Sequence, residues 1–234
     1  MTCRRLVPVL ILVCVACKPA PQAAKPAAAS GPHVRATVVT IRTTTQPDNK
    51  TVTQTLVIAG DRARETNERD TWRLYDTKAN TVTYVDDIAK TIRTEPLAQI
   101  VKRRRGALAN ALPDHYPRAT LTRGAKRTLQ GVVAEQSIVT AGAFRHELWL
   151  GEHPAIPRGL FAMMHASETL SSPLAPMMRA AEESLLATRA FPLAEHIELA
   201  YGKSKIVVDR SVVSITQQDV PASLVTPPNG YTRR

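Results

Sequence analysis

The sequence contains only three cysteines, and all of them lie near its N-terminus, at Cys3, Cys14 and Cys17. The rest of the chain therefore has neither a disulfide bond nor a thiolate metal site. That part must be held together by the burial of apolar side chains alone. About 200 residues are enough for one domain with a single hydrophobic core, so one domain is predicted.

Aromatic residues and glycines are also scarce: aromatics make up 4% of the sequence, and there are ten glycines. Proteins that bind single-stranded nucleic acid interleave basic with aromatic residues, and this sequence does not. It also has no glycine-rich loop of the kind that holds phosphate groups. The basic run from Lys102 to Arg105 would wrap around a helix axis and form a solvated face. The net charge of +11 therefore does not predict a nucleic-acid partner.

Long hydrophobic runs are missing as well. The longest apolar run, Leu6 to Ala16, follows the basic residues Arg4 and Arg5. As a helix it would cover about 16 Å, against about 30 Å for the hydrocarbon core of a bilayer. A basic start before a short apolar run is typical of an export signal. The stretch Val13–Cys17 resembles the bacterial lipobox, in which the cysteine is lipidated and becomes the first residue of the mature protein.

This resemblance implies a signal peptide at residues 1–16 and lipid attachment at Cys17, so that the protein meets a membrane through its N-terminal lipid. A lipoprotein cysteine carries several acyl chains, which together give stable anchoring. An ordinary secretory signal cut near Ala16 is the alternative. Lys18 stands where lipoproteins retained in the inner membrane often have aspartate. We therefore expect the outer membrane of the cell envelope, on its periplasm-facing side.

The segment after Cys17 is rich in alanine and proline up to His33 and has little that could be buried in a core. Proline-rich chains favour an extended conformation of about 3.1 Å per residue, so this segment could hold a domain up to roughly 50 Å from its anchor. We predict a tether over residues 17–33, with the lipidated Cys17 as its first residue. Removal of the signal lowers the net charge from +11 to +9, which would still attract anionic headgroups.

Beyond the tether, runs rich in threonine and valine alternate apolar with polar residues, as is typical of β-strands. The turn cluster Pro47–Asn49 predicts a hairpin. Within Thr71–Asp76, the alternation of Trp72 and Leu74 with Tyr75 predicts one packed and one wetter face. The predicted strands are 34–42, 51–58, 71–76, 81–86, 91–94, 118–122, 128–138, 144–150, 193–201, 204–209 and 212–217.

Two other segments repeat apolar residues at helical spacing. One begins at Leu97 and is closed by Pro113, and the other lies near Met177–Ala190. The predicted fold class is therefore α+β: a large curved antiparallel sheet covered by about two helices, in a single domain over residues 34–234.

Catalytic motifs are not recognisable. His146–Glu147 and Glu152–His153 superficially resemble a metalloprotease motif, but that motif needs two histidines one helical turn apart. Here the histidines are seven residues apart, across a predicted strand and Gly151. We therefore predict a protein that is not an enzyme, with no catalytic residue, metal site or cofactor. A hydrolase that uses His146 and Glu147 is the least favoured alternative.

Methionines are few but clustered, since four of the five lie at 163, 164, 177 and 178. Methionine is flexible and is common on surfaces that adapt to apolar partners. These side chains either fill gaps between helix and sheet or line a ligand cavity. A curved sheet covered by helices can enclose an apolar ligand. The residues predicted to line such a cavity are Trp149, Phe161, Met163, Met164, Met177 and Met178.

Several stretches resemble an uncharacterised bacterial lipoprotein family, DUF4412. They are the strands and turns within Leu74–Thr94, Leu129–Glu135, Glu147–Trp149 and the C-terminal Val212–Tyr231, and the resemblance extends over residues 34–231. That family is similar in fold to the periplasmic lipoprotein carriers LolA and LolB, which have an incomplete β-barrel lidded by helices that receives acyl chains. The resemblance implies a LolA-like half-barrel here, with the two predicted helices as its lid.

Together these observations predict a membrane-anchored periplasmic lipoprotein with a half-barrel that binds lipid, such as an acyl chain, or another apolar ligand. The alternative is a structural or adaptor lipoprotein of the envelope. In that case the sheet would be filled by its own side chains, and the basic surface would dock on protein partners or on the anionic envelope surface. The sequence identifies no protein partner.

Overall fold

Antiparallel β-strands make up most of the computed structural model, which describes residues 31–66, 70–111, 120–168, 187–201 and 204–234. Residues 31–234 form one compact unit. The strands are β1 (His33–Gln46), β2 (Lys50–Ala59), β3 (Arg62–Thr66), β4 (Thr71–Asp76), β5 (Thr81–Asp86), β6 (Thr91–Pro96), β7 (Thr120–Leu129), β8 (Val132–Ala141), β9 (Phe144–Gly151), β10 (Phe191–Tyr201), β11 (Ser204–Pro221) and β12 (Thr232–Arg233). The helices are α1 (Leu97–Ala111) and α2 (Leu160–Ser167), with a 3₁₀ turn, η1, at Ala222–Val225.

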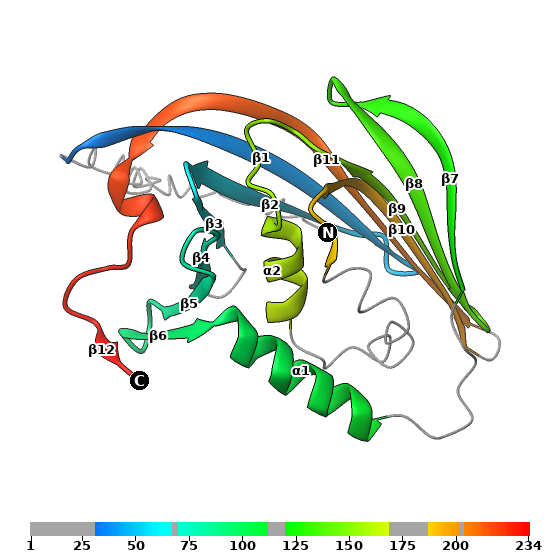
Figure 1. Cartoon of the computed structure of the whole chain (residues 1–234), viewed down its shortest axis with the longest axis horizontal. Coiled ribbons are helices and arrows are strands. Elements are labelled where there is room, and N and C mark those ends of the chain that lie inside the picture. The colour runs from blue at the N-terminus through cyan, green and yellow to red at the C-terminus, as the bar shows by residue number, and fades with distance from the viewer. Residues whose placement is uncertain (1–30, 67–69, 112–119, 169–186, 202–203) are drawn as a thin grey trace, which may run out of the picture. The chain divides into compact units, whose positions relative to one another are not determined.

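The described strands form one twelve-stranded sheet in the order β12-β6-β5-β4-β3-β2-β1-β11-β10-β9-β8-β7. The long strands β1 and β11 pair in its middle, from His33 opposite Pro221 to Gln46 opposite Val207. Within the described strands no pairing joins β7 to β12, so the sheet is an open arch that does not close on itself (Figure 1). A large curved antiparallel sheet with two helices confirms the predicted fold class.

The two faces of the arch carry different side chains, because successive residues of a strand point to opposite faces. We call the face that carries Thr43, Glu195 and Arg210 the inner face, and the opposite one, with Glu147 and His196, the outer face. Residues directly opposite each other in paired strands share a face. Figure 1 shows α1 and α2 under the arch, on the side of the inner face.

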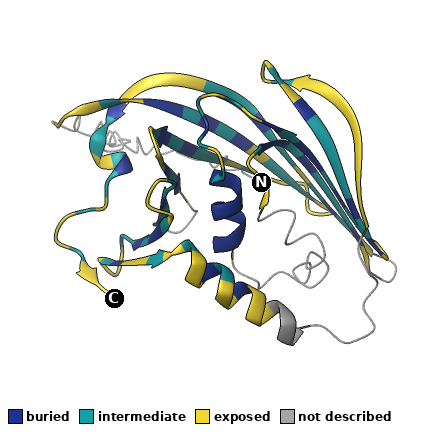
Figure 2. Ribbon diagram, viewed as in Figure 1, coloured by how far each residue is buried: buried dark blue, intermediate teal, exposed yellow. Residues whose placement is uncertain are grey.

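Helix α2 is buried along its whole length, and all eight of its residues are inaccessible (Figure 2). A helix that is apolar on all sides has no solvent-facing stripe and belongs inside a core. Helix α1 is more exposed and turns Ile100 and Arg104 inward. It begins at Leu97 as its spacing predicts. Neither described helix is long and apolar enough to cross a membrane.

The main hydrophobic core lies between the inner face and the helices, and a smaller cluster covers the outer face of β4 to β6. The smaller cluster contains Trp72, Leu74, Val85 and Ile92, against which Tyr231 packs. Tyr75, on the other side of β4, is completely buried in the main core. The prediction that this side of the strand is wetter is therefore wrong, since both faces are covered here.

Turn residues explain where the hairpins reverse. Asn49, Asn80 and the pair Gln130–Gly131 all have positive φ angles. Two consecutive residues with positive φ suit the two-residue turns that match the twist of a hairpin. The turn at Gln130–Gly131 divides the region predicted as one strand, 128–138, between β7 and β8.

Other boundaries also differ from the predictions. Strand β3 was not predicted, and the predicted pair 204–209 and 212–217 is one continuous strand, β11. The second predicted helix, Met177–Ala190, lies largely outside the described residues. The second helix among the described residues is instead α2, a segment in which no helix was predicted.

Candidate functional site

A cavity of about 280 Å³ lies between α2 and the inner face of the sheet. Its walls come from β1, β2, β9, β10 and β11 on the sheet side and from α2 and the residue after it on the other. The lining residues are Thr43, Gln54, His146, Phe161, His165, Glu168, Glu195, Ile197, Val208 and Arg210. The cavity thus combines apolar side chains with ionisable ones.

Strand register brings residues that are distant in sequence to this place. Arg210 on β11 lies opposite Thr43 on β1 and opposite Glu195 on β10. Two residues further along β10, Ile197 lies opposite both Val208 and His146. Because opposite residues share a face, these side chains form two neighbouring rows under the arch.

Glu195 is the centre of a buried group of charges. Its Oε2 lies 3.2 Å from Nε2 of His146, and Nη1 of Arg210 donates to its Oε1 at 3.4 Å. The side chains of His146 and Glu195 are 2% and 8% exposed. Burial acts to raise the pKa of Glu195, but the hydrogen bond from His146 and the charge of Arg210 hold that pKa below its ordinary value. The carboxylate therefore stays ionised at neutral pH.

Arg210 is surrounded by acidic groups. Burial acts to lower its pKa, but the negative charges of Glu195, Glu168 and Glu65 raise it above its ordinary value. Glu168 follows α2, is accessible to solvent and also lines the cavity. Burial raises the pKa of Glu168, and the neighbouring carboxylates of Glu195 and Glu65 raise it further, against the lowering effect of His165 and Arg210.

A second polar group lies under β3 and β4. The hydroxyl of Tyr75 donates to Oε2 of Glu65 at 2.6 Å and lies 3.2 Å from Oγ of Ser167 at the end of α2. Arg73 also reaches Oε2 of Glu65, at 3.4 Å. These contacts fix the end of α2 against the sheet.

Arg104 links the two helices. Its Nη2 lies 3.3 Å from Nε2 of His165, and its Nη1 donates to the backbone carbonyl of Glu168 at 3.0 Å. Arg104 is itself only 5% exposed. The basic run Lys102–Arg105 is therefore not uniformly solvated as predicted, because Arg104 points into the molecule.

The predicted cavity residues do not all lie together. Phe161 lines the cavity. Met163 and Met164 are buried in the core around it, with 2% and 3% of their surface exposed. Met177 and Met178 fall outside the described residues, as does the predicted lipid-attachment residue Cys17.

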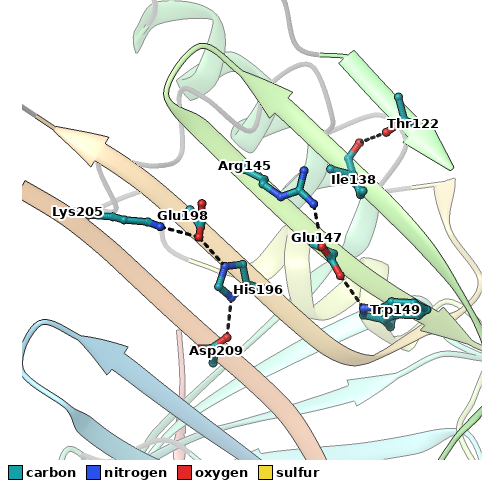
Figure 3. A network of polar contacts seen from close by, with 9 residues as sticks. All are labelled: Thr122, Ile138, Arg145, Glu147, Trp149, His196, Glu198, Lys205 and Asp209. Atoms are coloured by element: carbon teal, nitrogen blue, oxygen red, sulfur yellow. Dashed lines mark hydrogen bonds and ion pairs between the residues drawn. The ribbon is translucent and has the colours of Figure 1, made fainter. Parts of the chain in front are cut away.

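Trp149 is buried in the same core cluster as Phe161, but it does not line the cavity, and on β9 it shares the face of Glu147. Its Nε1 donates to Oε1 of Glu147 at 2.9 Å, and the guanidinium of Arg127 stacks 3.7 Å from the ring centre. Figure 3 shows this network, in which Arg145 also binds Glu147. Strand alternation explains the placement, because Trp149 follows the inner-facing Leu148.

The same alternation separates His146 from Glu147. His146 points to the inner face and pairs with Glu195, whereas Glu147 points to the outer face. The structure therefore does not bring together the two residues on which the hydrolase alternative depends. Among the described residues, no group of three or more acidic, histidine or cysteine side chains is arranged to hold a metal ion.

A larger hollow of about 620 Å³ lies at the β7–β9 end of the sheet, where Arg123, Lys126 and Val133 line it. It is an open groove, and Val133 is 65% exposed. The smaller cavity under α2 is the better candidate site, because it is more enclosed and collects the buried ionisable side chains.

Glu195 and Arg210 were not singled out from the sequence. The available signal was the presence of charged residues at inner-face positions in apolar strands, such as Glu195 two residues after Leu193. Without knowledge of the register, these positions could not be matched to His146.

Comparisons with known proteins give little further information. No family model matches the sequence, and no curated protein matches it. Two structures of PNGF-II, in space groups C2 and P21, share 12% and 11% identity with TM-scores of 0.46 and 0.43, over 86% of this chain and 31% of theirs. This chain thus spans about a third of their length. A LolA superfamily protein, NE2245 from Nitrosomonas europaea, shares 12% identity over 86% of this chain and 92% of its own, with a TM-score of 0.29. Similarities at these scores support no inference about function.

Proposed function

We propose that this chain is a membrane-anchored lipoprotein of the cell envelope that binds lipid or another apolar ligand and is not an enzyme. The observation that supports this is the cavity of about 280 Å³ between α2 and the inner face. Phe161, Ile197 and Val208 offer apolar contacts, and the Glu195 group offers polar ones. An amphiphilic ligand matches a site of this mixed character.

The location is part of the same proposal. Cys17 would carry the lipid, residues 17–33 would act as the tether, and the domain would face the periplasm from the outer membrane. Labelling cells with a fatty-acid analogue tests the anchor. The parent chain should be labelled, and the Cys17→Ser variant should not. A labelled Cys17→Ser variant would contradict lipidation at this residue.

Ligand binding is tested by mass spectrometry of an organic extract from the Cys17→Ser chain, purified from the periplasm without detergent. A stoichiometric lipid or other amphiphile would support the proposal and identify the ligand class. An empty extract from folded protein that also fails to bind the apolar fluorophore N-phenyl-1-naphthylamine would contradict it.

Two neighbouring residues of β11 provide a matched pair of variants. Val208 lines the cavity, whereas Asp209 lies on the outer face and is exposed. Val208→Trp should fill the cavity and abolish binding of N-phenyl-1-naphthylamine, and Asp209→Trp should leave it unchanged. Equal binding by both variants would place the fluorophore elsewhere.

A structural or adaptor lipoprotein is the second candidate, and one observation favours it. The described side chains of α2 pack into the core under the arch, and Leu160, Met163 and Met164 are buried there. An empty extract combined with strongly salt-dependent association of the Cys17→Ser chain with envelope fractions would favour this candidate.

A further inference from the structure

The charges around the cavity balance one another. The described residues within and next to it include three guanidinium groups, of Arg73, Arg104 and Arg210, and three carboxyl groups, of Glu65, Glu168 and Glu195. Arg73 contacts Glu65, Arg210 contacts Glu195, and Arg104 binds the backbone of Glu168. Among these six described groups the formal charges cancel, so together they offer neither a surplus positive charge for an anion nor a surplus negative charge for a cation.

An added charge would be poorly tolerated here. A ligand carboxylate placed near Arg210 would also lie near Glu195, which stays ionised, and near Glu168. Glu168 also lines the cavity and adds a second carboxylate there. A ligand ammonium would in turn compete with Arg210. Burying a charge without its own partner costs far more than burying a hydroxyl group.

Neutral hydrogen-bonding groups are available in the same cavity. Thr43 contributes a hydroxyl and Gln54 an amide, and both can donate and accept. His146 also lines the cavity, but it lies on β9, three strands away from Thr43. Its Nδ1 is buried and has no hydrogen-bond partner among the described protein atoms.

The size of the cavity limits the apolar part of the ligand. Its volume of about 280 Å³ is at the lower end of the range for small-molecule sites, which begins near 300 Å³. A lipid with two acyl chains is far larger than this. One chain, lying against Phe161, Ile197 and Val208, is the apolar group of suitable size.

We infer that the ligand is a single-chain amphiphile whose polar end is uncharged and bears a hydroxyl group, such as a long-chain alcohol or a monoacylglycerol. The hydroxyl binds at Thr43 and Gln54, which lie on the neighbouring strands β1 and β2, and the chain lies along the apolar wall. This inference rests on the proposed function and specifies its ligand class.

The test is a competition among three ligands with the same chain. Decanol, decanoate and decylammonium, below their micelle-forming concentrations at pH 7.5, are compared for displacement of N-phenyl-1-naphthylamine from the Cys17→Ser chain. Decanol should bind at least about tenfold more tightly than either ion. Decanoate or decylammonium binding as tightly as decanol would overturn the inference and leave the proposed function intact. No binding of the fluorophore would overturn both.

Two residues of β10 extend the test. Glu195→Gln removes the one inner-face carboxylate that contacts Arg210, whereas Glu198→Gln makes the same change on the outer face. In Glu195→Gln the affinity for decanoate relative to decanol should rise by about tenfold, because an unpaired guanidinium attracts an anion. Glu198→Gln should keep the ranking of the parent chain. An unchanged ratio in folded Glu195→Gln would overturn the inference. If that variant does not fold, the ranking in the parent chain decides alone.

Discussion

At the scale of single residues, Glu195 has the largest structural role in the inner face. It accepts hydrogen bonds from His146 and Arg210, which come from two other strands. Removal of its charge would leave the largely buried guanidinium of Arg210 without the carboxylate that contacts it. Breaking a buried pair from one side is costly, even where the intact pair adds little net stability.

Glu195→Gln should therefore lower the free energy of unfolding by about 3 kcal/mol at neutral pH. Chemical denaturation with the parent chain as reference measures the difference. Glu198→Gln on the same strand is the control, because Glu198 pairs with Lys205 in an exposed position and should change the denaturation midpoint little.

The difference between the parent chain and Glu195→Gln should depend on pH. The folded protein holds the pKa of Glu195 below its ordinary value, so the stabilisation is present above the pKa of the unfolded chain, about 4.3. It should disappear as the pH falls below this value, through the lowered pKa of the folded state. A difference that instead grows toward low pH would contradict the assignment of an ionised Glu195.

His196 on the outer face should titrate above the ordinary range of histidine. Its Nδ1 lies 2.6 Å from Oδ1 of Asp209 and its Nε2 lies 3.0 Å from Oε1 of Glu198 (Figure 3). The hydrogen bond with Asp209, followed by that with Glu198, raises the pKa of His196. This contribution to stability is complete below the unfolded pKa of about 6.5 and is lost as the pH rises through the folded pKa.

An NMR titration of the His196 ring measures this pKa directly. Asp209→Asn should bring the pKa back toward its ordinary value. A His196 that titrates normally in the parent chain, or identically in both proteins, would show that the contacts with Asp209 do not form.

At the scale of the elements, α2 determines the position of the site, because it forms the wall opposite the sheet. Its first turn follows Gly159, which has φ of 80°. A residue with a side chain is disfavoured in this left-handed conformation even where there is open space around it. No other atom lies within 4 Å of a side chain built at this position, so any cost of substitution comes from the backbone alone.

Two glycine-to-alanine variants separate this backbone effect from packing. Gly159→Ala should lower the free energy of unfolding by about 1 kcal/mol. Gly106→Ala, in the exposed part of α1 and equally free of contacts, should raise it by about 0.5–1 kcal/mol. Thermal unfolding measured side by side tests both signs. A stabilising Gly159→Ala would contradict the left-handed start of α2.

The same elements show how far the sequence predicts the fold. Apolar and polar alternation predicted most strands and the hairpin at Pro47–Asn49, and helical spacing predicted α1. The alternation did not predict β3, and it divided β11 into two strands at Arg210. In both places charged residues interrupt the pattern, and such residues are typical of turns unless their partners in the fold are known. Helical spacing did not predict α2, since a helix that is apolar on all sides has no periodicity.

The site itself was less predictable than the fold. Phe161 was among the apolar residues predicted to line a cavity, and it does line the cavity under α2. The charged residues were not expected, because His146 and Glu195 are 49 positions apart and meet only through the pairing of β9 with β10. Trp149 was expected there, but one step along β9 places it on the other face.

At the scale of the whole described unit, the two faces of the sheet are stabilised differently. Helices cover the inner face, whereas the C-terminal segment covers the outer face of β4 to β6. There the hydroxyl of Tyr231 donates to Asp87, which also accepts from Nε1 of Trp72. The rest of the outer face near β9 to β11 is held by surface ion pairs (Figure 3). In the described part of the chain, the inner face combines a cavity with buried polar side chains.

The most direct test of ligand binding under the arch is an NMR measurement of contacts between decanol and methyl groups of the protein. In the Cys17→Ser chain with labelled isoleucine and valine methyls, the account predicts nuclear Overhauser effects from the decanol chain to Ile197 and Val208, which line the cavity. Contacts confined to the exposed apolar residues Ile88 and Val133 would contradict it.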